Sequence, residues 1–576
     1  MLKKARKPMG RAGSLLVSLL VTAVVGLVYF YVSLPAINPH SGDFYTFLLL
    51  LCVVYTVCVF VLSAKPPDQG ETVVVRTPAE KVKEWFLFVK KSCLPVLILC
   101  AVIILVTVVG QIISLPIFRA SAYRELLTVQ SGDFAADVAQ ISFNEIPTLD
   151  RSSAEYLGDR QMGTLSDMVS QFEYSNDSTQ INYQGRPVRV APIAYADLIK
   201  WFTNRGNGLP AYVVVDMVTQ EATVTRLSEG MKYSFSEPLN RNILRHLRFQ
   251  YPTMMFATPE FEIDETGHPW WVAPQVVKTI GLFGGVDIRG AVLVDAVTGE
   301  SQYHEEVPLW VDTLYVPELI MQQYDYYGTL IRGFINSILG QRDVTQTTDG
   351  YNYIAMNDDV YMYTGVTSAN ADQSNLGFLL TNQRTKETHY YVAPGATETA
   401  AMASARGVVQ DLGYTATFPL LLNISGEPTY FIPLKDATNL VKSYAMVNVA
   451  QYQIVAVGST VSDCERAYVQ MLSDRGVVRP DEVPITQDHA AGVVEEIRTA
   501  VINGNSCYFI RLMGSDVFYS FSAAQDREVI TLNVGDAVTI EYAEPAPSIL
   551  DHEAPPSIYD GYALHINERG AVSFES

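Results

Sequence analysis

The apolar positions of this chain are concentrated first in three long stretches, at residues 13–34, 44–64 and 94–118. Each stretch is long enough for the about 20 helical residues that cross the hydrocarbon core of a bilayer. Their central parts contain no charged side chain, whereas helices that conduct ions or protons usually carry one. The pattern therefore predicts a multi-pass anchor of three transmembrane helices over residues 1–118, without transport by these helices alone.

The charged residues beside the apolar stretches predict how the helices are oriented. The link at residues 35–43 contains no Lys or Arg. By the positive-inside rule, basic segments stay in the cytoplasm, so three crossings place everything after residue 118 outside the cell. A cleaved signal peptide is the alternative for the first stretch, but its apolar run exceeds the about 7 to 15 residues of a signal core. The basic residues that carry this argument are Lys3, Lys4, Arg6, Lys7 and Arg11, and then Arg76, Lys81, Lys83, Lys90 and Lys91.

Beyond the third stretch the apolar positions form short strands, and one arrangement recurs. A Gly-x-Pro turn followed by aromatic or β-branched residues begins at Gly185, Gly208, Gly267 and Gly426. Glycine supplies unusual dihedral angles and proline fixes φ at the start of a strand. Recurrence at this spacing indicates duplicated supersecondary units that bury a common core.

A second recurring element is an apolar strand that ends in Asp or Asn and is followed by Thr and an acidic residue. It ends at Asp216, Asp295 and Asn382, and a fourth apolar strand at 444–457 lacks this ending. Asp, Asn and Thr side chains bond nearby backbone N–H groups in tight turns. We therefore interpret the pattern as a hairpin turn rather than as a ligand site.

Segments with helical spacing lie between these strands, at residues 121–140, 316–339 and 397–412. The glycine-rich segment 281–290 has neither the Lys-Ser/Thr of a phosphate loop nor its context, and is interpreted as a loop. Mixed strands and helices predict an α+β body rather than a β-sandwich.

These elements resemble the PepSY domain, a small helix-plus-antiparallel-sheet module of exported bacterial proteins whose second half often reads as a strand followed by Asp-x-x-Thr-Gly-Glu. Segment 292–300, Val-Leu-Val-Asp-Ala-Val-Thr-Gly-Glu, is the best match. The wider stretch, including Gly-His-Pro-Trp-Trp-Val at 267–272, is similar to uncharacterised multi-pass membrane proteins of Gram-positive bacteria. The resemblance implies two pairs of PepSY-like units, over residues 119–310 and 311–478, and brings no established activity.

Prolines at 480 and 484 mark a boundary before the last segment, residues 488–576. Short strands are predicted at 493–498, 507–512 and 538–542, with turns at 503–504 and 535–536. The segment 532–538 resembles the turn before a strand in small SH3-like or OB-like barrels. A small β-barrel domain is therefore expected here, and its scarcity of basic residues favours contact with protein or glycan over nucleic acid.

Charge and cysteine content narrow the classes of partner. The chain contains 40 basic and 61 acidic residues, and 29 of the basic and 56 of the acidic residues follow residue 115. So acidic an outer region repels nucleic acid and anionic headgroups. Four of the six cysteines lie in or beside the apolar stretches, and the other two, Cys464 and Cys507, are able to pair but form no metal-binding motif.

Residues with the chemistry of a site are few. The eight histidines form no His-Glu-x-x-His set, and no Gly-x-Ser-x-Gly elbow accompanies a base, so no catalytic residue and no cofactor is predicted. Oxygen-rich residues at 349–359 lack the spacing of an EF-hand, and no metal site is predicted. The candidate binding surface consists of aromatic residues and a histidine: His268, Trp270, Trp271, Tyr351 and Tyr353.

The sequence thus predicts a membrane-anchored extracytoplasmic scaffold or binding protein without enzymatic activity, with the bilayer and an envelope protein as partners. Its setting would be cell-envelope assembly or a membrane complex. An envelope hydrolase, or a regulator of an envelope peptidase, is one alternative. An accessory subunit of a transporter is another.

Overall fold

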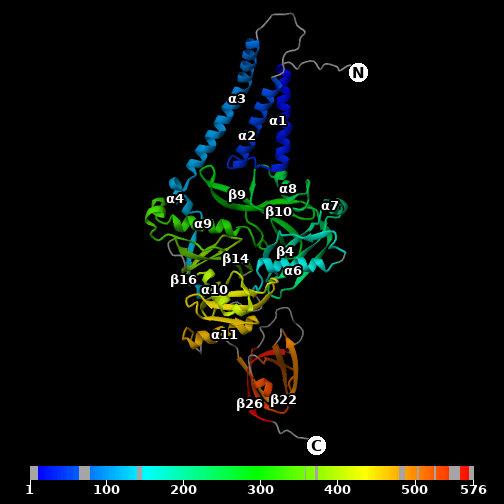
Figure 1. The fold of residues 1–576 in the computed structure, drawn as a ribbon, viewed down its shortest axis with the longest axis vertical. Coiled ribbons are helices and arrows are strands. Elements are labelled where there is room, and N and C mark those ends of the chain that lie inside the picture. Colours follow the sequence, from blue (N-terminus) through cyan, green and yellow to red (C-terminus); the bar gives the residue numbers. More distant parts are fainter. Residues whose placement is uncertain are drawn as a thin grey trace. The chain divides into compact units, whose positions relative to one another are not determined.

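The computed structural model describes residues 11–63, 78–138, 146–165, 167–356, 358–369, 374–478, 487–502, 505–523, 527–543 and 558–569. The chain divides into two compact units, residues 1–471 and residues 472–576. The first unit contains long apolar helices and a body of antiparallel sheets (Figure 1). The predicted α+β class is confirmed.

In the described part of the chain, three helices are long and apolar enough to cross a membrane, as predicted. They are α1 (Arg11–Ser33), α2 (Gly42–Ser63) and α3 (Pro78–Ile113). The third begins well before the predicted apolar stretch and contains Pro95. Apolar side chains such as Leu16 and Leu27 project outward from α1 with 69% and 71% exposure, which suits contact with lipid tails.

Within the described residues, the body repeats one unit four times, each a helix followed by five strands. Repeat 1 consists of α6 (Arg151–Gly163), β2 (Phe172–Tyr174), β3 (Thr179–Tyr183), β4 (Arg186–Tyr195), β5 (Leu209–Asp216) and β6 (Ala222–Met231), with an added helix α7 (Leu198–Asn204). Repeat 2 consists of α8 (Ile243–Gln250), β7 (Met255–Phe256), β8 (Glu260–Ile263), β9 (Pro269–Ile280), β10 (Gly284–Asp295) and β11 (Ser301–His304).

Repeat 3 consists of α9 (Pro317–Thr329), β12 (Thr345–Thr347), β13 (Asn352–Met356), β14 (Asp359–Ser368), β15 (Ser374–Asn382) and β16 (Thr388–Ala396). Repeat 4 consists of α10 (Glu398–Val408), β17 (Thr415–Ala416), β18 (Leu420–Ile424), β19 (Glu427–Lys435), β20 (Val441–Asn448) and β21 (Val455–Gly458), and α11 (Val461–Asp474) follows it. In every repeat the third strand is long and pairs with both short strands on one edge and with the fourth strand on the other.

The strand-ending Asp and Asn residues form the predicted turns. Asp216 Oδ1 accepts the backbone N–H groups of residues 218 and 219 at 2.8 Å. Asp295 and Asn382 accept the equivalent N–H groups at 2.7 to 3.0 Å. The fourth apolar strand, predicted at 444–457, is instead two strands, because the chain turns after Asn448, whose Oδ1 accepts the N–H of Gln451. The interpretation as hairpin turns is confirmed at these positions.

Several local predictions are wrong. The helix predicted at 316–339 ends at Thr329, and a separate short helix follows at Asn336–Gly340. Residues 121–140 do not form one helix: α4 (Pro116–Arg124) is followed by β1 (Val129–Gly132) and α5 (Phe134–Asp137), and residues 139–140 lie outside the described part. Strand β1 joins the third sheet beside β16 in parallel, so distant pairing overrides local helical spacing. Segment 281–290 is not a loop, because its glycines turn β9 directly into β10.

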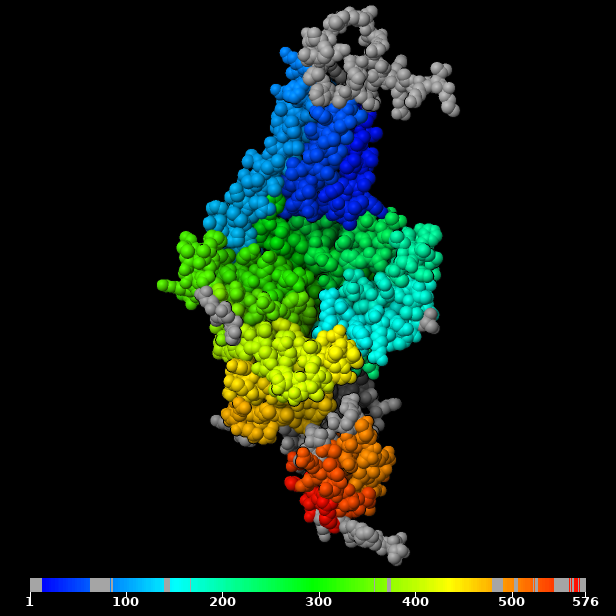
Figure 2. All heavy atoms as spheres, in the orientation of Figure 1, coloured from blue at the N-terminus to red at the C-terminus, as the bar shows by residue number. Residues whose placement is uncertain are grey.

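The anchor helices are docked against repeat 2 rather than joined to it by a free linker. The tip of the β9–β10 hairpin lies against the ends of α2 and α3, where the backbone N–H groups of Leu282 and Phe283 both donate to Ser114 Oγ at 3.0 Å. The Phe283 ring packs edge-on against Tyr45. Figure 2 shows the same contact as blue anchor atoms resting on the green atoms of the body.

The end of α1 makes a second contact with repeat 2. The guanidinium of Arg245 lies 4.3 Å from the centre of the Tyr31 ring, and Arg248 Nε donates to the carbonyl of Leu34. The backbone N–H of Ile37 donates to the carbonyl of Pro252. The carbonyl that follows the end of α1 is thereby satisfied, and the contacts join the body to the anchor.

The second unit is a small barrel, made of β22 (Gln487–Ile502), β23 (Asn505–Leu512), β24 (Phe518–Ser522), β25 (Ala537–Ala543) and β26 (Ile558–Glu568). Strand β22 pairs with β23 along one part and with β25 along another, which closes the sheet. Alternate residues such as Val538 and Ile540 fill its core. The predicted turn at 503–504 lies outside the described residues.

Candidate functional site

A cavity of about 490 Å³, partly open to solvent, lies where all four repeats of the body meet. Corresponding strands reach it with their first residues: Thr179 of β3, Glu260 of β8 and Asn352 of β13. Phe418, just before β18, takes the equivalent place in repeat 4. The cavity is thus a product of the repeat arrangement, and its size falls within the range of small-molecule sites.

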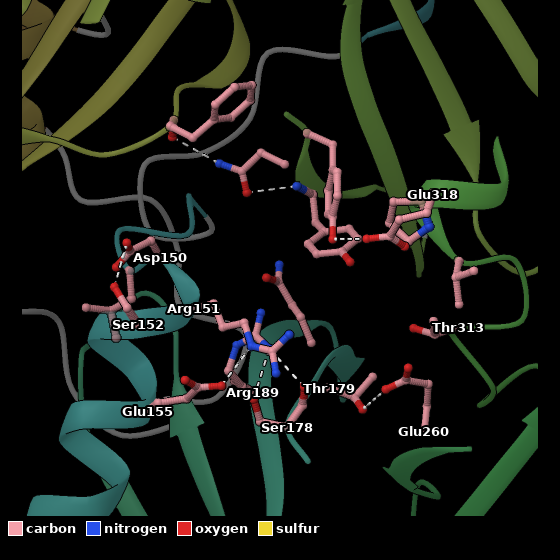
Figure 3. Close-up of a pocket in the computed structure, with 18 residues that line it drawn as sticks. Asp150, Arg151, Ser152, Glu155, Ser178, Thr179, Arg189, Glu260, Thr313 and Glu318 are labelled. Carbon is pink, nitrogen blue, oxygen red and sulfur yellow. Dashed lines mark hydrogen bonds and ion pairs between the residues drawn. The ribbon is translucent and has the colours of Figure 1, made fainter. Parts of the chain in front are cut away.

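The N-termini of two helices also line the cavity. Helix α6 begins there because Asp150 Oδ1 accepts the N–H of Ser153, which is the N-cap arrangement. Helix α9 begins at Pro317, a residue suited to the first helical turn. Arg151, Ser152 and Glu155 of α6 and Glu318 of α9 face the cavity (Figure 3).

An ion pair closes the wall between repeats 1 and 4. Lys435 Nζ lies 2.8 Å from Asp150 Oδ2 and donates to Ser152 Oγ at 3.0 Å. Burial opposes the charge of Asp150, but the hydrogen bonds from Lys435 and Ser153 outweigh it and hold the pKa of Asp150 below its ordinary value. The two residues are 285 positions apart, so this pair joins the ends of the repeat array.

Two arginines enter the cavity from repeat 1, as Figure 3 shows. Arg151 Nε donates to Glu155 Oε1 at 2.8 Å, and its side chain is 60% exposed. Arg189, on β4, is only 4% exposed. Its Nη1 donates to the carbonyl and hydroxyl oxygens of Ser178 at 3.1 and 3.2 Å, whereas its Nε has no hydrogen-bond partner in the part of the chain that the structure describes.

The carboxylates of the cavity already have partners. Glu155 Oε1 accepts the hydroxyl of Ser178 as well as Arg151, and Glu260 Oε2 accepts the hydroxyl of Thr179 at 3.1 Å. Burial raises the pKa of Glu260, which favours its neutral form. No carboxylate in the described part of the chain forms an ion pair with Arg189, although buried guanidinium groups are normally paired.

Two further acidic residues, Glu262 and Asp312, lie close to the cavity lining and are buried, with 0% and 2% exposure. Glu262 accepts the backbone N–H groups of Asp312 and Thr313, each at 2.9 Å, and Asp312 accepts that of Asn182 at 2.7 Å. Burial, reinforced by their proximity, raises the pKa of Asp312, and burial raises that of Glu262. These residues fix the segment that presents Thr313 to the cavity.

Aromatic side chains form another part of the cavity wall. The Tyr351 and Tyr353 rings meet edge to face at 5.6 Å, and the Tyr351 hydroxyl donates to Glu318 Oε1 at 3.0 Å. Asn352 Nδ2 donates to the carbonyl of Phe418 at 3.3 Å, which holds the repeat 4 loop in place. Burial raises the pKa of both tyrosines, so both hydroxyls remain protonated donors.

The structure separates the residues of the predicted binding surface. Tyr351 and Tyr353 line the cavity. His268 instead lies at a turn with its Nε2 3.2 Å from Asp295 Oδ1, and Trp270 Nε1 donates to Asp264. Trp271 is fully buried in the core that repeats 1 and 2 share, and donates to the carbonyl of Tyr233.

None of the charged residues that line the cavity was among the site residues predicted from the sequence. Arg189 carried one usable signal, because it interrupts a run of strand residues, Val188 to Ile193, that are otherwise apolar. A charge within a buried strand requires a partner or a function. Within the described residues, no three His, Cys, Asp or Glu side chains are placed to hold a metal ion.

Comparisons with known proteins give no family. No family model matches the chain, and no curated protein matches it. Among solved structures, a mutant levansucrase of B. megaterium matches with 9% identity and a TM-score of 0.17, over 77% of this chain and 96% of the other. A similarity this low carries no argument about fold or activity, and the resemblance to PepSY units stays a prediction.

Proposed function

We propose that this protein is a membrane-anchored binding protein of the cell envelope, and that it holds its ligand in the cavity between the four repeats. The observation that carries the proposal is a cavity of ligand size lined by residues from every repeat, among them the buried Arg189, which has no ion-pair partner among the described residues. The basic flanks of the first and third spans favour an outward-facing body.

Binding is favoured over catalysis by the state of the cavity's carboxylates. Asp150, Glu155, Glu260 and Glu318 are each held by a hydrogen bond or ion pair from a neighbouring side chain. Such groups orient a ligand, whereas a general base needs a lone pair directed at the substrate. A docked anchor would also keep the cavity at a fixed distance from the bilayer, which suits presentation to a membrane partner.

The test compares what the full-length protein retains from native membranes with what two variants retain. Ser152→Trp places an indole at the lining of the cavity, where the wild-type residue is exposed on α6. Asp159→Trp, at an exposed position of the same helix that does not line the cavity, is the matched control. Small molecules and proteins that co-purify are identified by mass spectrometry.

The proposal predicts a species that accompanies the wild type and the Asp159→Trp variant but not the Ser152→Trp variant. Identical recoveries from all three proteins would place binding elsewhere and refute the role of the cavity. Absence of any specific species from the folded wild type would refute the binding function itself.

A further inference from the structure

We infer that the ligand of this cavity carries an oxyanion, a carboxylate or a phosphate, that lies against Arg189 with Arg151 beside it. The inference rests on the proposed function and names the chemical class of the ligand. It follows from the surroundings of Arg189: two arginines and four carboxyl residues line the cavity, yet none of these carboxyl groups forms an ion pair with Arg189.

Arg189 is a buried cation without an acidic partner in the described part of the chain. Its guanidinium is almost completely buried, yet among the described residues its hydrogen bonds go only to the neutral oxygens of Ser178, and Nε has no partner there. A guanidinium group has five N–H donors in a planar fork that matches two oxygens of a carboxylate or phosphate. Burial lowers the pKa of Arg189, which is the mark of a charge that the protein itself does not compensate.

The neighbouring acids do not supply the missing anion. Glu155 is used by Arg151 and Ser178, and the pKa of Glu260 is raised by burial, so its proton is retained more readily than at the surface. Arg151 lies close enough to depress the pKa of Arg189 further. Figure 3 shows the two arginine side chains reaching the same part of the cavity. Two adjacent guanidinium groups favour an oxyanion over a neutral or cationic ligand.

The aromatic and polar residues of the cavity wall indicate what the rest of the ligand consists of. Tyr351, Tyr353 and Phe418 present ring surfaces, and Glu318 and Asn352 present oxygen and nitrogen atoms between them. Such a wall suits a ring or short chain with hydroxyl or amide groups. A sugar acid, a sugar phosphate or the carboxyl end of a short peptide has both parts.

The experiment uses a matched pair of probes, glucuronate and glucose, which differ in one carboxylate, together with inorganic phosphate as a second oxyanion. Binding to the full-length protein in detergent is measured from the ligand-dependent rise in melting temperature at near-neutral pH. The variants are Arg189→Gln, which removes the charge, and Arg189→Lys, which retains it. Arg160→Gln, at an exposed position of α6 outside the cavity, is the control.

The inference predicts saturable stabilisation of the wild type by glucuronate or phosphate and not by glucose. The Arg189→Gln variant loses at least about tenfold in affinity, Arg189→Lys loses less, and Arg160→Gln behaves as the wild type. Without ligand, the Arg189→Gln variant melts no lower than the wild type, because a buried unpaired charge has been removed. This last measurement separates lost binding from lost folding.

Equal stabilisation by glucose and glucuronate would overturn the inference and leave the proposed function standing. Failure of both glucuronate and phosphate to bind the wild type would overturn it as well. Stabilisation by phosphate alone would identify the oxyanion as a phosphate, and stabilisation by glucuronate alone would identify it as a carboxylate. The proposed function is tested independently, by comparing the species that co-purify from native membranes with the wild type and with the Ser152→Trp variant.

Discussion

Replacing Ser114 by alanine tests whether the anchor and the body are one rigid structure. Ser114 is 5% exposed, and its Oγ accepts the backbone N–H groups of Leu282 and Phe283, both at 3.0 Å, while it donates to the carbonyl of Gly110 at 2.7 Å. Alanine removes the acceptor without adding volume. Two N–H groups at the tip of the β9–β10 hairpin then lose their partner.

The magnitude follows from the cost of an unsatisfied buried donor, which is about 1 to 3 kcal/mol. Two donors give about 2 to 6 kcal/mol, and partial relaxation of the hairpin tip toward water reduces this to about 2 to 3 kcal/mol. Because about 1.4 kcal/mol corresponds to a factor of ten, local opening of the tip should become roughly 30- to 140-fold more frequent.

Amide hydrogen exchange on the full-length protein in detergent measures this opening directly. The amides of residues 282 and 283 should exchange faster in Ser114→Ala, while strands β4 and β5 keep their protection. Ser121→Ala, at an exposed position of α4, is the control. Unchanged exchange at 282 and 283 would refute the docked arrangement and favour a body that moves freely on its anchor.

Two further predictions concern buried charges. Lys435→Met leaves Asp150 without its cation and should lower the free energy of unfolding by about 1 to 3 kcal/mol, as measured by urea titration. Lys442→Met is the control, because Lys442 is 45% exposed and lies 4.0 Å from Asp436, and it should change the free energy of unfolding by less than about 0.5 kcal/mol. Because the pKa of Asp312 is raised in the folded protein, the stability that this group contributes is present below its unfolded pKa of about 3.9 and is lost as pH rises through the folded pKa. Asp312→Asn cannot ionise and should therefore gain on the order of 1 to 3 kcal/mol over the wild type between about pH 5 and pH 9; a pH-independent difference in thermal unfolding would contradict this reasoning.

The features that could be predicted from the sequence are those determined by neighbouring residues. Apolar runs indicate membrane helices because the bilayer core tolerates little else, and Asp216 and Asp295 form turns through bonds to their own backbone. By contrast, β1 was mistaken for helix because its pairing partner, β16, lies about 260 residues away along the chain.

The cavity could not be predicted, because none of its walls comes from one segment. Arg189 and Tyr353 belong to different repeats, and only the packing of four similar sheets brings their strands to one place. The aromatic segment that contains Trp271 was interpreted as a recognition surface. Successive side chains of a strand point to opposite faces, however, and in β9 the Trp271 side chain points into the core. The sequence shows which residues are polar or aromatic, but the packing of the repeats determines which of them lie together in the cavity.

The most direct test of the account is a cryo-electron microscopy map of the full-length protein purified from native membranes in mild detergent. The account predicts density that is not protein in the cavity between the four repeats, in contact with Arg189 and the Tyr351 and Tyr353 rings. A map of sufficient resolution to show these side chains, with only solvent in the cavity or with the ligand bound elsewhere on the body, would contradict it.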